Sequence, residues 1–353
     1  MEKTRLGRTN LQVSRTAFGA LPIQRVDFAQ ARTILRQAYE GGITFFDTAR
    51  SYSDSEEKIG YALSDVRANI FLATKSSGAT DRASLLEKIE ISLRNLKTDH
   101  VDILQLHNPS ELPDPDDPDS LYGGLLEAQR RGMTRFIGVT NHTLKNAIEV
   151  ARSGLYDTIQ FPLSAISAAA DLELVDICRE HDVGLLAMKG LCGGLITDAR
   201  LAFAALRQYE NVVPLWGIQR ERELAEFLAL EADPPLLDDE MRAKIEREKG
   251  TLAGNFCRGC GYCLPCPVDI PIPMAARMAF LLRRSPSAPL LTPEWQEKMH
   301  RIEDCIECEE CKERCPYGLD TPVLLKRMLQ DYVAFEEAIA AGKTPPDWSA
   351  ALA

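Results

Sequence analysis

Two short cysteine motifs near the end of the chain have a spacing suited to metal binding. They are Cys257-x2-Cys260-x2-Cys263-x2-Cys266-Pro267 and Cys305-x2-Cys308-x2-Cys311-x3-Cys315-Pro316. A reducing compartment keeps cysteines from pairing as disulfides, so such a cluster indicates metal ligation there. Zinc needs four ligands, usually in two C-x2-C knuckles, whereas each motif here has four cysteines followed by proline. The sequence therefore favours iron–sulfur clusters over zinc.

Four polar residues in the first half of the chain have types suited to acid–base chemistry. Asp47, Lys75 and His107 each end a hydrophobic run, and Tyr52 lies in the segment after Asp47. Taken singly, Asp47 and Lys75 could form a structural ion pair. His107 could be a core histidine and Tyr52 a surface residue. If the runs are neighbouring strands of a barrel, their carboxyl ends share one rim, and the joint placement favours a catalytic site.

The sequence alternates β-rich runs with amphipathic stretches, and this alternation predicts the strands and helices that must position these residues. The predicted strands are 15–18, 44–47, 70–75, 101–107, 135–140, 158–161, 184–188 and 211–215. The clearest predicted helices are 29–40, 83–96, 144–152 and 171–181. This alternation predicts an α/β fold, a (β/α)8 TIM barrel. An open doubly wound sheet is the alternative, but no G-x-G-x-x-G follows the first strand.

Composition narrows the classes of partner. The chain of 353 residues is 45% hydrophobic and 26% charged, the balance of an ordinary soluble protein. Its net charge of −11 disfavours nucleic acid, because phosphate binding needs a basic surface. No apolar stretch reaches the roughly 18 residues of a membrane span, and the first residues lack the apolar core of a signal peptide. We expect a cytoplasmic protein with no nucleic-acid or membrane partner.

Several segments resemble the aldo-keto reductase family. They are GGITFFDTARSYSDSEEKIGYAL, LATK, LKTDHVDILQLHNP and GMTRFIGVTNH, and the resemblance covers roughly residues 4–230. With the cysteine motifs, the chain resembles the iron–sulfur branch of that family. The resemblance implies an oxidoreductase of class EC 1.1.1.- that reduces an aldehyde or ketone, a small-molecule carbonyl substrate.

The resemblance also implies a role for each of the four polar residues. Tyr52 would be the acid that protonates the carbonyl oxygen. Lys75 would lower the pKa of Tyr52 by its charge, and Asp47 would hold Lys75 in place. His107 would polarise or orient the substrate carbonyl. The hydride would come from NADP(H) or NAD(H) lying across the same rim.

The residues implied to bind this cofactor fall into two groups. Those at the nicotinamide end are Thr140, Asn141, Gln160 and Met188. Those at the adenosine end are Gly217, Gln219, Arg220 and Glu226. Arg220 and Arg222 favour NADPH over NADH, although they could equally be an exposed helix start. The chain departs from the family at Met188, where an aromatic ring is usual, and at Phe227, where an adenine-binding asparagine is common.

The second cysteine motif matches the bacterial ferredoxin run, and the resemblance to two-cluster ferredoxins implies two 4Fe-4S clusters with crossed ligation. The first cluster would use Cys257, Cys260, Cys263 and Cys315. The second would use Cys305, Cys308, Cys311 and Cys266. The spacing before Cys266 is one residue shorter than usual, which leaves the partner cluster of Cys266 open.

The expected domain order follows from these two parts. Residues 1–235 would form the aldo-keto reductase barrel and residues 236–250 a helical linker. Residues 251–335 would form a small, α-rich, ferredoxin-like two-cluster domain, and residues 336–353 a C-terminal tail.

Two functions follow from combining a barrel with clusters. A nicotinamide moves two electrons as a hydride, whereas a cluster moves one electron, and no flavin motif is visible to connect them. The favoured hypothesis is an NAD(P)H-dependent carbonyl reductase with structural or regulatory clusters. The alternative is a reductase whose clusters receive electrons from ferredoxin or another electron-transfer protein, without nicotinamide. A non-catalytic redox sensor is disfavoured by the intact set of four polar residues.

Overall fold

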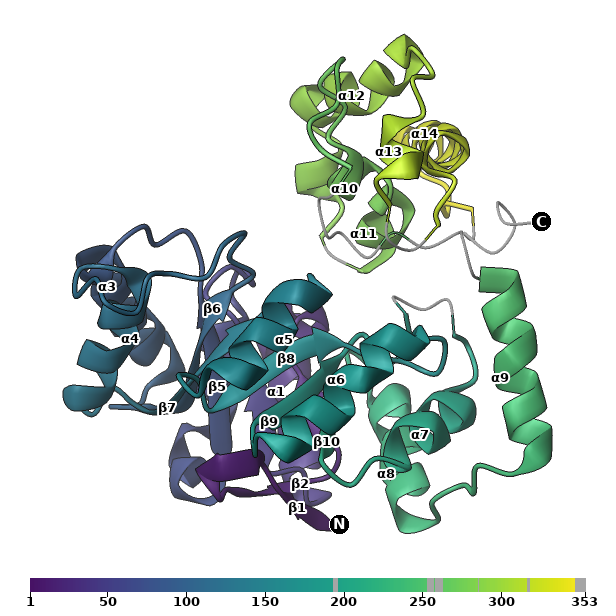
Figure 1. The fold of residues 1–353 in the computed structure, drawn as a ribbon. Helices are drawn as coiled ribbons and strands as arrows, with labels where there is room; N and C mark the ends of the chain where they lie inside the picture. Colours follow the sequence, from purple (N-terminus) through teal and green to yellow (C-terminus); the bar gives the residue numbers. More distant parts are fainter. Residues whose placement is uncertain (193–195, 253–256, 258–262, 285, 316–317, 347–353) are drawn as a thin grey trace. The chain divides into compact units, whose positions relative to one another are not determined.

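Parallel strands between Ala17 and Gly217 form a closed barrel (Figure 1). The structure is a computed structural model that describes residues 1–192, 196–252, 257, 263–284, 286–315 and 318–346. Within this part of the chain, eight parallel strands form one ring, which β10 closes by pairing with both β3 and β9. The strands are β3 (Ala17–Gly19), β4 (Phe45–Asp47), β5 (Phe71–Ser76), β6 (Val101–His107), β7 (Thr134–Thr140), β8 (Thr158–Pro162), β9 (Gly184–Met188) and β10 (Val212–Gly217). The predicted barrel and its predicted strands are confirmed.

Helices alternate with these strands and cover the outside of the ring (Figure 1). They are α1 (Phe28–Glu40), α2 (Ser55–Leu63), α3 (Arg82–Leu96), α4 (Leu121–Arg130), α5 (Leu144–Ser153), α6 (Ala169–Glu180), α7 (Ala199–Arg207) and α8 (Glu221–Ala232). Short 3-10 turns are η1 (Gly7–Thr9), η2 (Pro22–Arg25) and η3 (Ser64–Asn69). Side-chain caps set several helix starts, because the carboxylates of Asp27 and Asp81 accept N–H groups of the first turn.

An antiparallel hairpin precedes the barrel, and the sequence analysis did not predict it. Its strands are β1 (Lys3–Arg5) and β2 (Gln12–Ser14). The hairpin contributes Leu6, Leu11 and Val13 to a buried cluster with inward residues of the strands, among them Phe45 and Ile103. The hairpin thus covers one end of the barrel interior with apolar side chains.

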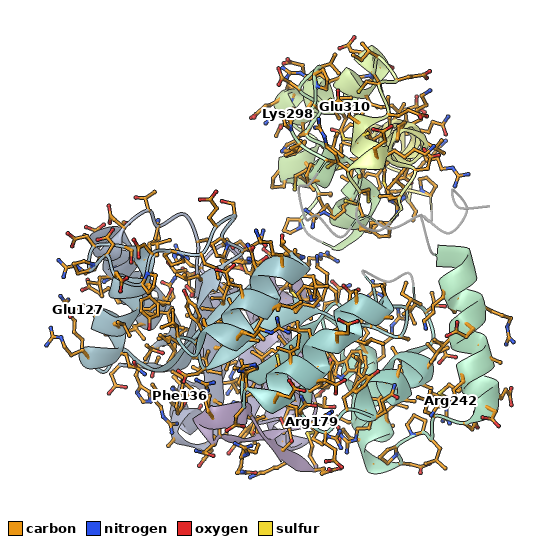
Figure 2. All side chains as sticks on the ribbon, viewed as in Figure 1. Glu127, Phe136, Arg179, Arg242, Lys298 and Glu310 are labelled. Atoms are coloured by element: carbon orange, nitrogen blue, oxygen red, sulfur yellow. The ribbon has the colours of Figure 1, made fainter. Side chains whose placement is uncertain are left out.

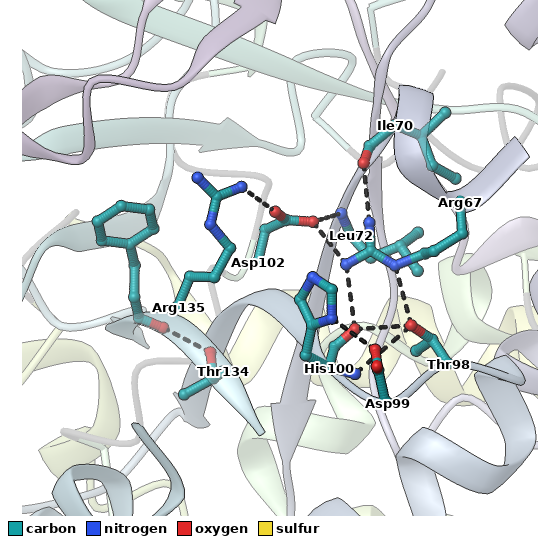
Figure 3. Close-up of polar contacts among 10 residues, drawn as sticks. Arg67, Ile70, Leu72, Thr98, Asp99, His100, Asp102, Thr134 and Arg135 are labelled. Atoms are coloured by element: carbon teal, nitrogen blue, oxygen red, sulfur yellow. Dashed lines mark hydrogen bonds and ion pairs between the residues drawn. The ribbon is translucent and has the colours of Figure 1, made fainter. Parts of the chain in front are cut away.

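A buried carboxylate joins strands near the amino ends of β5, β6 and β7 (Figure 3). The side chain of Asp102 is only 2% exposed and lies 2.9 Å from Arg67 and 2.7 Å from Arg135. The same carboxylate accepts the N–H of Leu72 at 2.9 Å. Arg67 also donates to the carbonyl oxygens of Ile70 and His100. This network fixes the end of the barrel opposite the carboxyl rim, where barrel enzymes gain stability rather than activity.

The second compact unit is helical and begins within a long charged helix. The chain divides into two compact units between Arg242 and Ala243, inside the helix α9 (Asp239–Leu252). The other helices of this unit are α10 (Ile272–Ala275), α11 (Met278–Arg284), α12 (Pro293–His300), α13 (Glu310–Glu313) and α14 (Thr321–Ala340), with 3-10 turns η4 (Ala288–Leu290) and η5 (Arg301–Asp304). Helix α14 continues beyond residue 335, where the sequence predicts the tail to begin.

The core of the second unit is apolar and contains a bidentate ion pair. Met278, Met299 and Met328 are fully buried in one cluster, beside Tyr332. The Tyr332 hydroxyl donates to a backbone carbonyl at 2.8 Å, so this buried polar group has a hydrogen-bond partner. Arg283 binds both carboxylate oxygens of Asp331, at 2.7 and 2.8 Å.

Outer helical faces of both units carry charged side chains (Figure 2). Arg179 of α6 pairs with Asp176 at 2.6 Å, and more than half of each side chain is exposed. Such surface pairs contribute little to stability. Among the described residues, no helix combines the length and apolar character that a membrane crossing requires.

The Asp102 network generates a stability prediction. Asp102→Asn keeps the shape of the side chain but removes the charge that two arginines share. We expect the free energy of unfolding of the barrel to fall by about 2–3 kcal/mol, measured by urea denaturation. The control is Asp182→Asn, because the Arg5–Asp182 pair is about half exposed on both sides and should change stability by less than about 1 kcal/mol. Equal effects of the two substitutions would contradict a special role for Asp102.

Candidate active site

Three neighbouring strands bring the four predicted catalytic residues together at the carboxyl rim. Strand β4 pairs with β5, and β5 pairs with β6, so the ends of these strands lie side by side. Asp47 ends β4, Lys75 is the penultimate residue of β5 and His107 ends β6. The Tyr52 and His107 rings lie 5.8 Å apart in an edge-to-face contact. The ammonium of Lys75 lies 5.1 Å from the centre of the Tyr52 ring.

The innermost part of the site is a buried ion pair. The Lys75 ammonium is 2.6 Å from a carboxylate oxygen of Asp47 and donates to the Thr48 carbonyl at 2.6 Å. Lys75 is 0% exposed and Asp47 3%. Burial raises the pKa of Asp47, while Lys75 and hydrogen bonds from Gln105 and Gln160 oppose that rise. Each charge is therefore held in place by the other, since neither can reach water.

Tyr52 is fixed by a tight turn directly above this pair. Its N–H donates to the Ala49 carbonyl at 3.0 Å, and its own carbonyl accepts the N–H of Ser55 at 2.8 Å. The Ser55 hydroxyl in turn donates to the Ala20 carbonyl at 2.9 Å, which anchors the turn to the segment after β3. Burial raises the pKa of Tyr52 above its usual value, and the charge of Lys75 acts in the opposite direction. The charge of Lys75 therefore acts to lower the pKa of Tyr52, as expected, but the rise caused by desolvation is larger than this effect.

His107 is a neutral group in this site. Burial lowers its pKa to about 3, and the nearby charge of Lys75 acts in the same direction. One ring nitrogen, Nδ1, lies 2.7 Å from the Ser77 hydroxyl. A neutral imidazole can donate a hydrogen bond to a carbonyl oxygen, but it is not a strong acid. The sequence analysis did not identify Ser77, and its only signal was its position directly after a predicted strand.

Gln105 connects the ion pair to the next strand. Its amide nitrogen donates to Asp47 at 3.3 Å, and its amide oxygen accepts the Thr140 hydroxyl at 2.9 Å. Gln105 is fully buried in the middle of β6. The sequence analysis missed this residue as well, although an amide inside the apolar run VDILQLH was a usable signal.

The residues expected at the nicotinamide end lie on β7, β8 and β9. Thr140 pairs in register with Gln160, and both are buried. The amide of Asn141 already binds protein backbone, donating to the Pro109 carbonyl at 2.9 Å and accepting the Thr143 N–H at 2.7 Å. The buried amide oxygen of Gln160 has no hydrogen-bond partner among the described residues. That acceptor fits the N–H of a carboxamide, as a nicotinamide would supply.

Residues expected at the adenosine end surround the start of α8. Gly217 ends β10, and the amide oxygen of Gln219 accepts from Arg25 at 3.1 Å. The backbone N–H groups of Gln219 and Arg220 donate to the Glu223 carboxylate at 2.9 and 3.2 Å. The Glu223 carboxylate thus accepts hydrogen bonds from backbone N–H groups that could otherwise donate to a phosphate. Of the four residues expected at the adenosine end, Arg220 is the one with a positive charge. Its exposed guanidinium lies 3.8 Å from the Glu223 carboxylate.

Two further residues of α8 differ in exposure. Glu226, expected at the adenine, is exposed. Phe227 is buried and stacks on Trp216, with ring centres 4.5 Å apart. Phe227 is therefore a core residue here, consistent with its departure from the family pattern. Met188 ends β9 half-buried, beside the end of β8.

Most of the motif cysteines gather in the second unit, around one hollow that opens to solvent. The cysteines that line it are Cys263, Cys266, Cys305, Cys308 and Cys311. Burial raises the pKa of Cys311, as do the neighbouring Cys305, Cys308 and Cys266. Cys257 and Cys315 pack against the apolar core of the same unit, and Cys260 lies outside the described residues. Among the described residues, no group of three or more cysteine, histidine, aspartate or glutamate side chains is arranged to hold a metal ion. The gathering of five motif thiols around one hollow is therefore the observation that bears on a cluster bound by thiolates.

Comparisons with known proteins match the two parts of the chain separately. A family model described as the aldo/keto reductase family matches residues 16–226, and one described as a 4Fe-4S dicluster domain matches residues 256–320. Aldo-keto reductase YhdN of Bacillus subtilis is 28% identical over 215 residues, which are 56% of this chain and 64% of that protein. The chain thus spans just under two thirds of the length of this relative.

Two solved structures share the fold of the barrel. Aldo-keto reductase AKR11C1 from Bacillus halodurans, in its holo form, has a TM-score of 0.60 at 24% identity over 70% of this chain and 96% of its own. An aldo-keto reductase from Klebsiella pneumoniae in complex with NADPH has a TM-score of 0.60 at 21% identity over 70% of this chain and 94% of its own. At these identities the likeness shows a common fold.

The environment of His107 generates a prediction about pH. Its lowered pKa means that the ring stays neutral throughout the range in which an ordinary histidine titrates. We expect its carbon-bound ring protons to keep the same NMR shifts from pH 8 to pH 5, assigned with a His107→Asn variant. The folded protein binds this proton less readily than the unfolded chain, so this group makes stability fall as the pH drops below about 6.5. A titration midpoint for His107 between pH 6 and 7 would contradict the prediction.

Proposed function

The chain belongs to the aldo/keto reductase family, and on that basis we propose that its barrel reduces an aldehyde or ketone, with a proton from Tyr52 and a hydride from NADPH. One observation carries the proposal, namely the buried Lys75–Asp47 pair directly beside the Tyr52 ring. A fixed positive charge at this position stabilises the phenolate that remains when the proton has moved.

The four residues divide the work on the substrate. Tyr52 donates its proton to the carbonyl oxygen while His107, being neutral, donates a hydrogen bond to the same oxygen. Lys75 stabilises the charge on the Tyr52 oxygen, and Asp47 keeps the Lys75 ammonium from moving away. Tyr52 is protonated at neutral pH, and the charge of Lys75 offsets part of the rise in its pKa that burial causes.

Bound NADPH supplies the hydride. The buried amide oxygen of Gln160, which has no hydrogen-bond partner among the described residues, would accept a carboxamide N–H of the nicotinamide. Thr140 and Asn141 complete the wall on that side, and Met188 packs against the ring. At the other end, Gly217, Gln219, Arg220 and Glu226 line the adenosine. NADPH is favoured over NADH by the exposed Arg220 guanidinium and by the Klebsiella pneumoniae relative solved in complex with NADPH.

The second unit, we propose, holds two 4Fe-4S clusters. Cys305, Cys308, Cys311 and Cys266 bind one of them. These four thiols line one hollow, and Cys263 of the other set lines it as well. Cys257, Cys260, Cys263 and Cys315 bind the other. Such clusters carry single electrons and suit a reducing compartment, so we propose a cytoplasmic location for the protein.

A second candidate function uses the clusters as the electron source. Cys308 is exposed, and the neighbouring Ile306 is 62% exposed, so the second motif is open to a partner protein. Ferredoxin or another electron-transfer protein would then reduce the clusters, which would pass two electrons to the carbonyl one at a time. Tyr52 would supply one of the two protons that the reduction needs, and solvent would supply the other. Turnover with reduced ferredoxin but not with NADPH would favour this candidate.

The test of the proposed function measures NADPH oxidation by the anaerobically reconstituted protein with a panel of small aldehydes and ketones. We expect turnover by the wild type and a loss of at least about 100-fold in Tyr52→Phe, because the proton donor is gone. Cluster absorbance should be unchanged. The control is Tyr61→Phe, since Tyr61 is an exposed tyrosine of α2 and should retain full activity. Equal rates for Tyr52→Phe and the wild type would exclude Tyr52 as the acid.

The cluster assignment generates a prediction about iron content. Cys308→Ser should lower the iron bound per chain and weaken the absorbance near 400 nm that thiolate-bound clusters give, roughly halving both because one cluster of two is affected. Cys178→Ala serves as the matched control, since Cys178 is a buried barrel thiol outside both motifs. Full iron content in Cys308→Ser would refute its assignment as a ligand.

A further inference from the structure

The hydroxyl of Ser77 makes a short contact that the reaction described above does not require. Ser77 follows β5 directly and is partly buried. Its oxygen lies 2.7 Å from Nδ1 of His107, a distance typical of a good hydrogen bond. Among the described residues, the exposed Ser51 hydroxyl also approaches this nitrogen, but at the longer distance of 3.4 Å. Ser77 is thus the dominant partner of His107 on that side of the ring.

Neutral imidazole exists as two tautomers with opposite hydrogen-bonding properties. One ring nitrogen carries a hydrogen and donates, while the other presents a lone pair and accepts. Because burial holds the pKa of His107 at about 3, the ring in this site has a single hydrogen to place. A hydrogen on Nε2 allows that nitrogen to donate to a carbonyl oxygen, whereas a lone pair on Nε2 would repel the same oxygen.

We propose that Ser77 is a positioning residue that donates its hydroxyl hydrogen to Nδ1 of His107 and so keeps the ring hydrogen on Nε2, the nitrogen that faces the substrate carbonyl. The inference rests on the proposed function, since it concerns the same site. A hydroxyl can donate in this geometry, and accepting its hydrogen at Nδ1 requires the other nitrogen to carry the ring hydrogen. Ser77 acts only through His107 and does not touch the substrate.

The rest of the surroundings fixes the ring plane but not the tautomer. The Tyr52 ring meets the imidazole edge to face, with an angle of 80° between the planes, which limits rotation of His107. The backbone of His107 is held in register with Thr140 on β7. Neither contact distinguishes a hydrogen on Nδ1 from one on Nε2. The Ser77 hydroxyl can donate to Nδ1 or accept from it, so the direction of this hydrogen bond and the tautomer are set together.

The experiment compares Ser77→Ala, Ser77→Thr and Ser51→Ala in two measurements. The first is the nitrogen NMR spectrum of 15N-histidine-labelled protein, which distinguishes a protonated from an unprotonated ring nitrogen and needs no substrate. The second is kcat and KM for NADPH-dependent carbonyl reduction. We expect the wild type to carry the hydrogen on Nε2, and Ser77→Ala to shift toward the other tautomer. Its kcat should fall roughly fivefold, the worth of one hydrogen bond, with little change in KM for NADPH.

The two control variants separate positioning from a structural effect. Ser77→Thr retains a hydroxyl and should restore both the spectrum and kcat, while Ser51→Ala should resemble the wild type because its contact is long. An unchanged tautomer in Ser77→Ala, or a changed tautomer with unchanged kcat, would overturn the inference. If the wild type shows no turnover with NADPH, the proposed function fails, and the nitrogen spectra still decide whether Ser77 sets the tautomer.

Discussion

Two opposite charges buried without water, on Lys75 and Asp47, are the constraint on which the rest of the site depends. Removing an ammonium and a carboxylate from water is costly, and only close pairing with further hydrogen bonds offsets that cost. The barrel meets this requirement because β4 and β5 are adjacent and parallel, so the two side chains arrive at one level of the rim. The Thr48 carbonyl and the Gln105 amide supply the additional hydrogen bonds. Tyr52 and His107 then lie against a charge that cannot move.

The sequence was sufficient to predict the barrel and the meeting of the four polar residues. Parallel strands are buried on both faces, so a run such as 184–188 is apolar and easily recognised. Convergence of Asp47, Lys75 and His107 follows from topology alone once neighbouring strands are assigned in order. The N-terminal hairpin was missed because its strands are only three residues long and their side chains do not alternate clearly between apolar and polar.

Other features of the site depend on burial and distance, which sequence patterns do not give. The net direction of the Tyr52 pKa shift reflects a competition between desolvation and the charge of Lys75, and the residue types alone favoured only the second. Ser77 could not be distinguished from other hydroxyls that follow strands. Cys266 is far along the chain from the second motif, which begins at Cys305. The two meet at one hollow only because of how the second unit folds. The chain thus combines a buried polar site that strand order assembles with a thiol-lined hollow that the fold of the second unit assembles.

The measurement that tests the central claim most directly is the pKa of the Tyr52 phenol when the buried charges are removed together. Asp47→Asn combined with Lys75→Met leaves neither an unpaired ammonium nor an unpaired carboxylate in the interior. Tyrosine labelled with 13C at the ring carbon bonded to oxygen reports the ionisation by NMR, with Tyr52→Phe to assign the signal. The account predicts that the Tyr52 pKa rises in the double variant. Burial remains, and the lost effect of the Lys75 ammonium, which lowers this pKa, is larger than the lost effect of the Asp47 carboxylate, which raises it. A pKa equal to or lower than that of the wild type would contradict it.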